Sequence, residues 1–325
     1  MAVMTAPPAV QDGGPSDVPS DVPSGMPSGV SRLSIPRTSS LPSLAPAPAS
    51  RRIGRCPVCN PQTIAASLTP EQGKSGSQGP AEPAERPAPR VTLPTGSVRD
   101  LTHVVGPDWP VFDLYVKPME IRRLANLAEH EYNALELTYN EHIGTHIDAP
   151  LHFDDDGLSV ERIPADSLVA PLAVVRIGDR AARDHVTELT VDDLLRWESR
   201  HGRIPDRALL AVDNGWAARI NTPGAFLNFD EKDGLYRFPG ISVEAAAFLV
   251  EERSVVGVGT DSPSLDPGSR PADPYTHRVI LPAGRYGVEC LAGLDTVPDV
   301  GAVAVVGAPR HAGGTGGPAR VLAFL

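Results

Sequence analysis

The sequence has few cysteines, few aromatic residues and no long apolar run. Three cysteines in 325 residues cannot form a dense disulfide framework, which excludes a small disulfide-stapled secreted domain. No run of 18 or more apolar residues occurs, so a membrane-spanning helix is excluded as well. A net charge of −11 is unfavourable for binding a nucleic-acid phosphate backbone. We therefore expect neither a nucleic acid nor a membrane to be the main partner.

The aromatic residues are missing from one part of the chain altogether. Residues 1–97 contain 18 of the 35 prolines and none of the 16 aromatic residues, the first of which is Trp109. They are rich in Ser, Ala and Gly and include the repeat Ser-Asp-Val-Pro at 16–19 and 20–23. Such a segment cannot bury enough apolar surface to offset its ordering entropy. We predict a disordered tail over 1–97 and one domain over 98–325.

The tail contains a single CxxC, formed by Cys56 and Cys59. A structural zinc site needs four ligands, and no second CxxC or nearby His completes this one. We interpret the two thiols as solvated, with an intermolecular half-site or a redox pair as the alternatives. Arg51-Arg52 precedes no long apolar segment, so the sequence does not predict export, and we expect a cytoplasmic protein.

From residue 98 onward the pattern is that of an α/β domain. Alternation over 135–140 indicates a half-buried strand, and apolar runs predict further strands at 172–177, 208–212, 255–258, 302–306 and 320–324. Thr190 and Asp193 form a candidate capping box for a helix that ends near Gly202. Ser242 is the candidate N-cap of a second helix over 243–253. Strands mixed with a few helices predict a single domain with a mixed β-sheet and flanking helices.

The densest set of potential ligands is the segment HIGTHIDAPLH at residues 142–152. His146 and Asp148 are two residues apart, so on an extended chain they point to the same face, and His142 shares that face. Pro150 prevents a regular helix through the segment. Imidazoles and a carboxylate on one face predict a metal site that suits Zn²⁺ or Mn²⁺. Surface histidines are the alternative interpretation, but it does not account for the clustering.

This segment resembles the HxGTHxDxPxH signature of the cyclase/kynurenine formamidase family of metal-dependent hydrolases. The resemblance continues in GTDS at 259–262, SLD at 264–266, HRVIL at 277–281, ECL at 289–291 and GGTG at 313–316. It implies a swivelling β/β/α type of fold over about 98–325. Cys290 departs from the Asn that the family often has there, and we interpret it as a buried structural thiol rather than a soft ligand.

The resemblance also implies a ligand set and a separate proton carrier. His142, His146 and Asp148 would be ligands from the first motif, His277 and Glu289 would complete the site, and Asp148 would be able to bridge two ions. His152 would be the general acid/base rather than a ligand. That division is chemically sensible, because a bound cation activates water while a free imidazole moves protons.

A second group of residues is expected to contact the substrate. Trp109, Phe112 and Tyr115 precede the site, and in this family such a segment often lines the pocket. Ordinary core packing is the alternative for all three. Trp216, Asp261 and Ser262 follow predicted strands, whose ends commonly face pockets. The segment 226–238 is expected to be a surface loop that shapes specificity.

The sequence thus predicts a metal-dependent hydrolase of a non-peptide C–N bond in a small-molecule amide. N-formylkynurenine, a tryptophan catabolite, is the first substrate that the resemblance suggests. The alternatives are an isatin-hydrolase-like enzyme for cyclic amides or imides, and a non-catalytic binding protein that keeps the fold. The resemblance further implies one or two zinc ions, with manganese as the alternative, and a homodimer or larger assembly.

Overall fold

The computed structural model describes residues 93–94, 96–112, 116–270 and 273–325. Tyr115 and almost all of the predicted tail, with Cys56 and Cys59, lie outside these residues. The sheet begins at Val98, and the carbonyl of Ser97 already accepts a hydrogen bond from the backbone of Leu325. Among the described residues, no helix is both long and apolar enough to cross a membrane.

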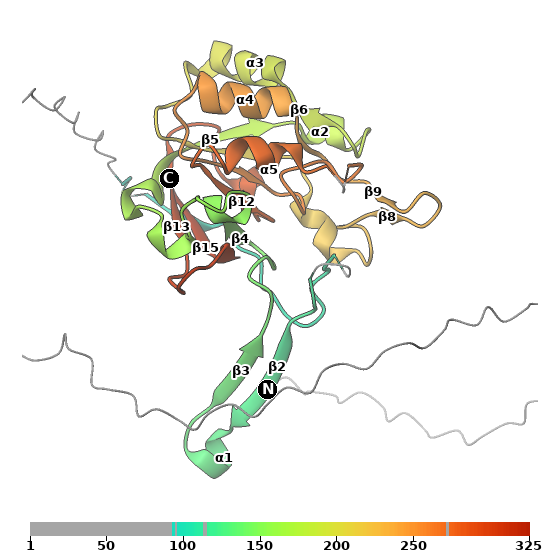
Figure 1. Ribbon diagram of the computed structural model, residues 1–325, viewed down its shortest axis with the longest axis vertical. Coiled ribbons are helices and arrows are strands. Elements are labelled where there is room, and N and C mark those ends of the chain that lie inside the picture. Colours follow the sequence, from blue (N-terminus) through green and yellow to red (C-terminus); the bar gives the residue numbers. More distant parts are fainter. Residues whose placement is uncertain (1–92, 95, 113–115, 271–272) are drawn as a thin grey trace, which may run out of the picture. The chain divides into compact units, whose positions relative to one another are not determined.

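One mixed sheet of nine strands organises the described chain (Figure 1). Its spatial order is β1-β15-β13-β5-β7-β11-β12-β4-β14. The strands are β1 (Val98–Asp100), β4 (His146–Asp148), β5 (Val169–Arg176), β7 (Leu209–Asp213), β11 (Gly257–Thr260), β12 (Tyr286–Glu289), β13 (Ala302–Gly307), β14 (Gly316–Pro318) and β15 (Arg320–Phe324). The strands β5, β7, β11 and β12 run parallel, and the flanking strands pair antiparallel. The predicted mixed sheet is confirmed.

Both faces of the central strands are buried. Leu172 and Val174 of β5 face a core shared with Ile147 and Val321, residues from opposite ends of the sheet, so the sheet curls around this core. Ala173 and Val175 face the opposite core, which the helices cover. This two-sided burial explains why the central strands are continuous apolar runs in the sequence.

Two of the helices form as their caps predict. Thr190 and Asp193 make a reciprocal capping box at the start of α3 (Val191–His201), and Ser242 caps α4 (Val243–Glu251). Trp197 of α3 and Leu249 of α4 pack into the second core. The remaining helices are the short α1 (Leu127–His130), α2 (Gly178–Ala181) and α5 (Tyr275–Ile280).

The predicted strand near residue 135 exists but is not half-buried. It is β3 (Ala134–Thr138), which pairs with β2 (Glu120–Ala125) in a two-stranded ribbon that carries α1 at its tip (Figure 1). Within the described residues, β2 and β3 pair only with each other, and Leu135 is 53% exposed. The prediction of burial is wrong because no described layer lies behind the ribbon.

Two further short strand pairs lie outside the nine-stranded sheet. They are β6 (Glu188–Leu189) with β10 (Gly240–Ile241), and β8 (Phe229–Asp230) with β9 (Leu235–Tyr236). The second pair lies inside the segment predicted as a surface loop, so that loop is a small hairpin.

Candidate metal centre and catalytic pocket

The site is built on β4, a three-residue strand that is buried at every position. His146 and Asp148 alternate with Ile147, so both polar side chains point to one face while Ile147 enters the core. On the neighbouring strand β12, Glu289 stands directly opposite His146. Directly opposed side chains lie on the same face of a sheet, which brings His146 Nε2 to 3.4 Å from Glu289 Oε2.

Asp148 is flanked by two residues without side chains. Gly287 of β12 and Gly316 of β14 are its register partners on the two sides. A Cβ at Gly287 would lie 2.9 Å from Asp148 Oδ2, so a larger residue there would displace the carboxylate. Gly287 thus makes room for a carboxylate that is only 1% exposed.

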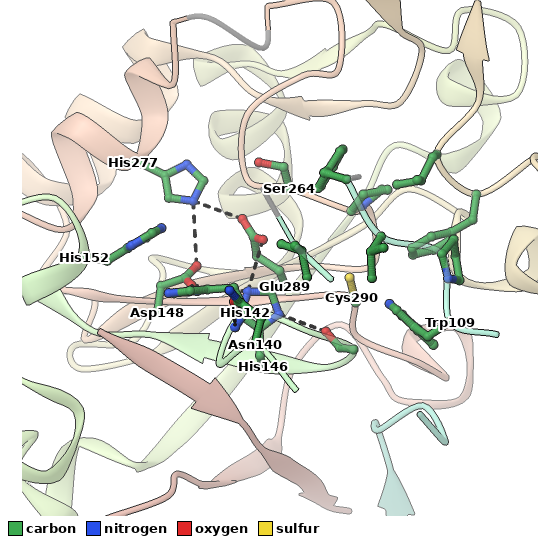
Figure 2. A pocket seen from close by; sticks show the side chains of 18 of the residues that line it. Trp109, Asn140, His142, His146, Asp148, His152, Ser264, His277, Glu289 and Cys290 are labelled. Carbon is green, nitrogen blue, oxygen red and sulfur yellow. Dashed lines mark hydrogen bonds and ion pairs between the residues drawn. The ribbon is translucent and has the colours of Figure 1, made fainter. Parts of the chain in front are cut away.

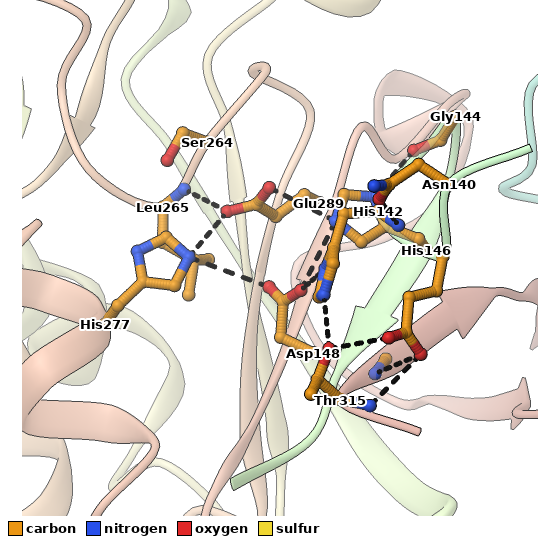
Figure 3. Close-up of polar contacts among 12 residues, drawn as sticks. Asn140, His142, Gly144, His146, Asp148, Ser264, Leu265, His277, Glu289 and Thr315 are labelled. Atoms are coloured by element: carbon orange, nitrogen blue, oxygen red, sulfur yellow. Dashed lines mark hydrogen bonds and ion pairs between the residues drawn. The ribbon is translucent and has the colours of Figure 1, made fainter. Parts of the chain in front are cut away.

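His277 reaches the same point from α5. Its Nε2 lies 3.1 Å from Glu289 Oε1 and 3.7 Å from Asp148 Oδ2 (Figure 3). The carboxylate of Asp266 accepts the backbone N–H of Thr276 and so fixes the first turn of this helix. His142 completes the cluster, with Nδ1 at 2.8 Å from Asp148 Oδ1. The structure therefore brings together all five predicted ligands.

Each of the three imidazoles turns one nitrogen toward the cluster, and its second nitrogen makes a hydrogen bond to a residue outside the cluster. His146 Nδ1 donates to the carbonyl of Gly144, and His277 Nδ1 donates to Asp266 Oδ2 at 2.5 Å. His142 Nε2 lies 2.9 Å from Thr315 Oγ1. Such outer hydrogen bonds fix the ring orientation and turn the remaining nitrogen toward the cluster.

The electrostatics of the cluster favour positive charge. Burial alone would lower the pKa of His146, but Asp148 and Glu289 outweigh it and raise the pKa to about 9. Burial is likewise outweighed at His277, where hydrogen bonds to the surrounding carboxylates hold the pKa well above its usual value. Burial would raise the pKa of Asp148, but the facing imidazoles hold it well below its usual value. A buried pair of carboxylates creates a strong local demand for cations.

The donor set fits a divalent cation. His142, His146 and Asp148 form one group, and Asp148, His277 and Glu289 form another, with the donor atoms of each group within 4.8 Å of one another. Asp148 Oδ1 faces the first group, whereas Oδ2 is buried and accepts no hydrogen bond in the described structure. A buried carboxylate oxygen that accepts no hydrogen bond costs free energy unless something binds it. Imidazole and carboxylate ligands are those that Zn²⁺ and Mn²⁺ accept.

His152 lies beside the cluster on the short 3₁₀ turn η1 (Pro150–His152). Its ring stacks on His142 at 4.0 Å between centroids and is 6.0 Å from the ring of His277. The structure shows ring contacts but no hydrogen bond for its ring nitrogens in the described part of the chain. Burial lowers the pKa of His152 to about 4, so its imidazole is neutral at neutral pH. It differs in this respect from His146 and His277.

The cluster opens into a cavity of about 440 Å³. In Figure 2 the cluster and His152 lie at one end of this cavity, and Cys290 and Trp109 lie at the other. Phe112, Phe226 and Val116 extend the apolar wall. Among the described residues that line the cavity there is no Lys or Arg. The structure thus places Trp109 and Phe112, two of the predicted pocket residues, on the cavity wall.

The other predicted pocket residues lie behind that wall rather than on it. Asp261 accepts the backbone N–H groups of Asn214, Trp216 and Ala217, and burial raises its pKa to about 6. Trp216 Nε1 in turn donates to the carbonyl of Phe226. Ser262 hydrogen-bonds Thr260 and the carbonyl of Ser264. These residues anchor the cavity wall, and none of the three is among the residues that line the cavity.

Several supporting residues were not singled out from the sequence. Asp266, Thr315 and Glu141 hold the imidazoles or their partners. Phe226, by contrast, begins the segment that was expected to shape specificity, and it forms part of the aromatic wall. Asp266 and Thr315 do lie inside the SLD and GGTG segments quoted for the resemblance. Each of these two segments contains a polar residue but no assigned ligand, and this was the signal in the sequence that could have identified Asp266 and Thr315. Cys290 is buried, and it belongs to neither group of donors, in line with a structural thiol.

Comparison with known proteins finds relatives that are similar in sequence and in structure. The Cyclase family model matches residues 99–267. Isatin hydrolase from Roseibium aggregatum is 29% identical over 245 residues, which cover 70% of this chain and 91% of that protein. Kynurenine formamidase from Salinibacter ruber is 27% identical over 201 residues, which cover 61% and 82%.

A solved structure is similar over the same region. Isatin hydrolase A from Labrenzia aggregata, bound to benzyl benzoate, superposes with a TM-score of 0.66 at 34% identity, over 70% of this chain and 93% of that one. These relatives are hydrolases, and they support an enzyme rather than the non-catalytic alternative. With the family match covering the first motif and the structure adding His277 and Glu289 from beyond it, the chain belongs to the Cyclase family of hydrolases.

Proposed function

We propose that this chain hydrolyses the C–N bond of a small, uncharged aromatic amide, and that a cyclic amide of the isatin type fits it better than N-formylkynurenine. The observation that carries the proposal is the cavity itself. It joins a cation-binding donor set to an aromatic wall, and its described lining offers no Lys or Arg for a substrate carboxylate. N-formylkynurenine bears an amino-acid group, whereas isatin has no charged group. Similarity to isatin hydrolases supports the same choice.

The proposed cofactor is Zn²⁺, with Mn²⁺ as the alternative, held by His142, His146, Asp148, His277 and Glu289. When bound, such a cation lowers the pKa of a coordinated water and polarises the substrate carbonyl. The chain's own part is to fix the donors. Three imidazoles are oriented by outer hydrogen bonds, and Asp148 offers one oxygen to each donor group.

His152 is the proposed proton carrier. Its ring nitrogens are not engaged in hydrogen bonds within the described structure, and its lowered pKa leaves a lone pair free at neutral pH. It takes a proton from the attacking water and returns it to the leaving nitrogen. Stacking on His142 holds this ring next to the donor set. Trp109 and Phe112 would hold the aromatic ring of the substrate at the other end of the cavity.

The central test combines a substrate panel with a variant of His152. Purified full-length protein loaded with Zn²⁺ or Mn²⁺ is assayed for kcat/KM on isatin and N-formylkynurenine. We expect isatin to be preferred about tenfold or more, the discrimination that an unpaired substrate charge produces. The His152→Ala variant should retain its metal and lose about 10²- to 10⁴-fold in kcat. His201→Ala, a variant at the end of α3, is the matched control and should keep both.

Two outcomes would contradict the proposal in different ways. A preference for N-formylkynurenine would show that the substrate is an aryl formamide rather than a cyclic amide. Unchanged kcat in His152→Ala would remove that residue from the reaction. Either result leaves the cation site to be examined by metal analysis.

We also propose that the chain forms a homodimer or larger assembly through the β2–β3 ribbon. Cross-strand pairs place Ile121 opposite Leu137 on one face and Arg122 opposite Glu136 on the other. One face of the ribbon is therefore largely apolar, with Arg123 beside Leu135, and its apolar side chains Ile121, Leu135 and Leu137 are all exposed. Two-stranded ribbons are marginal alone, and exposed apolar patches mark interaction sites. We propose a second copy of this chain as the partner that covers the exposed face, because every copy of the chain carries the same face.

A further inference from the structure

The turn before β14 packs against the first motif. The glycine-rich segment 313–316 comes from near the end of the sequence, and it lies against residues 141–148. Its contacts concern Glu141 and His142 rather than the cavity. Of these contacts, only the Thr315 hydrogen bond to His142 enters the proposed function, where it orients the ring, and Glu141 has no part in it.

The carboxylate of Glu141 accepts several hydrogen bonds from this turn. Its Oε2 accepts the backbone N–H groups of Thr315 at 3.1 Å and Gly316 at 3.3 Å, and lies 2.9 Å from His311 Nε2. Its Oε1 accepts the hydroxyl of Thr315 at 2.9 Å. One side chain that precedes a predicted ligand thus fixes a segment more than 170 residues later.

The direction of these hydrogen bonds is determined by chemistry. A threonine hydroxyl has one proton, and an ionised carboxylate can only accept. Because Thr315 donates its proton to Glu141, its oxygen is left to accept from His142 Nε2 at 2.9 Å (Figure 3). His142 therefore carries a proton on Nε2. The other nitrogen, Nδ1, lies 2.8 Å from Asp148 Oδ1, to which it donates while no cation is bound. When that proton is lost, the lone pair that becomes available to a cation is the one on Nδ1.

Close packing keeps the ring in this place. A Cβ at Gly316 would lie 2.7 Å from His142 Cε1 and 2.5 Å from the carbonyl oxygen of Ile147, so only glycine lets β14 pass the ring. On its other side the ring of His142 stacks on His152. Any rotation of His142 would disturb the donor set and the proposed proton carrier together.

From this geometry we propose that Glu141 and Thr315 are positioning residues that fix the Nε2-protonated tautomer of His142 and so present Nδ1 to the cation. The inference rests on the cation site of the proposed function and not on its substrate. Two hydrogen bonds connect the Glu141 carboxylate, the Thr315 hydroxyl and the His142 imidazole, and neither Glu141 nor Thr315 contacts the cation or the substrate. Loss of these hydrogen bonds should therefore weaken cation binding and disturb the tautomer, with the fold retained.

The test compares Thr315→Val, which removes the hydroxyl at nearly constant volume, with Thr315→Ser, which restores it. Zn²⁺ affinity is measured on the full-length, chelator-treated protein by competition with a chromophoric chelator. We expect Thr315→Val and Glu141→Gln to bind Zn²⁺ about 10- to 100-fold more weakly, as removal of outer partners does elsewhere. Thr315→Ser should remain close to the parent protein. Glu161→Gln is the matched control, because Glu161 accepts the N–H of Gly313 in the same turn without contacting His142.

A second measurement separates positioning from mere structural support. Nitrogen-15 NMR of labelled histidines reports which ring nitrogen is protonated, and His142→Gln identifies the signal. We expect a protonated Nε2 at His142 in the parent protein and a mixed tautomer in Thr315→Val. Protonation on Nδ1 alone in the parent protein would overturn the proposal, and this reading holds even if a variant fails to fold.

The remaining outcomes are equally decisive. Parent-like Zn²⁺ affinity in Thr315→Val, or equal weakening in Glu161→Gln, would overturn the proposal. A parent protein that binds neither Zn²⁺ nor Mn²⁺ would contradict the proposed function. The NMR spectrum alone would then decide whether Nε2 of His142 is protonated.

Discussion

Strand β4 and the β2–β3 ribbon depart from the usual distribution of residues in opposite directions. In β4, two ionisable side chains are buried almost completely. In the ribbon, leucines and an isoleucine are exposed on one face. Folded proteins avoid both situations unless something compensates. The first region therefore calls for a cation, and the second calls for a covering surface.

A carboxylate that the chain satisfies by itself sharpens the comparison. Asp193 is about as buried as the site residues, yet both of its oxygens have partners: Arg180 and Arg196 on one side, Arg180 and Thr190 on the other. Asp148 has one oxygen without a hydrogen bond in the described structure. Burial alone thus does not mark a binding site. A buried charge that the chain leaves unsatisfied does.

The largest expected effect comes from removing the charge at β4. Asp148→Ala takes away the one ligand shared by both donor groups, so bound metal and turnover should both be lost, the latter by about 10³-fold or more. Metal content by mass spectrometry and kcat on isatin are the measurements. Full metal occupancy in this variant would remove Asp148 from the ligand set.

The second-largest effect is expected from substitutions in the β2–β3 ribbon. Leu135→Glu combined with Leu137→Glu puts charge on the exposed apolar face, and the new carboxylate at position 135 would stand opposite Arg123 without like-charge repulsion. If a second copy covers this face, the loss of two buried leucines at about 1.5–3 kcal/mol each weakens association by about a hundredfold or more. Light scattering should then show a dimer or larger species for the parent protein and a monomer for the variant.

A control for the ribbon is available on the body of the domain. Val300→Glu changes a similarly exposed apolar residue before β13 and should leave the mass unchanged. A monomeric parent protein, or a variant with the parent's mass, would contradict the role given to the ribbon.

The smallest effect is expected at Asp193. Burial alone would raise its pKa, but hydrogen bonds from Arg180 and Thr190 outweigh burial and lower the pKa. A lowered folded-state pKa stabilises the fold above the unfolded value near 3.9, and this stabilisation is lost as the pH falls through that region. Asp193→Asn should therefore cost about 1 kcal/mol of unfolding free energy at pH 7, as a lost cap does, and progressively less below about pH 4.

Urea unfolding at several pH values, with and without Zn²⁺, measures this difference. The Zn²⁺-dependent gain in stability should be the same in Asp193→Asn as in the parent protein. A pH-independent difference between the two would show that the charge of Asp193 contributes nothing.

The sequence predicted the parts of this molecule that depend on neighbouring residues. Apolar runs located β5 and β13, and capping residues located α3 and α4, because local patterns specify them. It did not predict α5, which is short, lacks a side-chain cap and is held by Asp266, which lies before the start of the helix. Such an element depends on tertiary contacts that no local pattern reveals.

The same distinction applies to the site. The spacing of His146 and Asp148 was sufficient to place them on one face, and the family resemblance supplied His277 and Glu289. The register that sets Glu289 opposite His146 is a property of strand pairing and could not be derived from spacing. Alternation in β3 correctly indicated two unlike faces. It could not tell whether the apolar face would be covered by this chain.

Strand β4 also has a consequence for biosynthesis. Its two neighbours, β12 and β14, belong to the last part of the sequence, so β4 has neither edge paired while most of the chain is still being translated. Glu289 and the Thr315 turn emerge from the ribosome long after the first motif. The five donors can therefore come together only after nearly the whole domain has been synthesised.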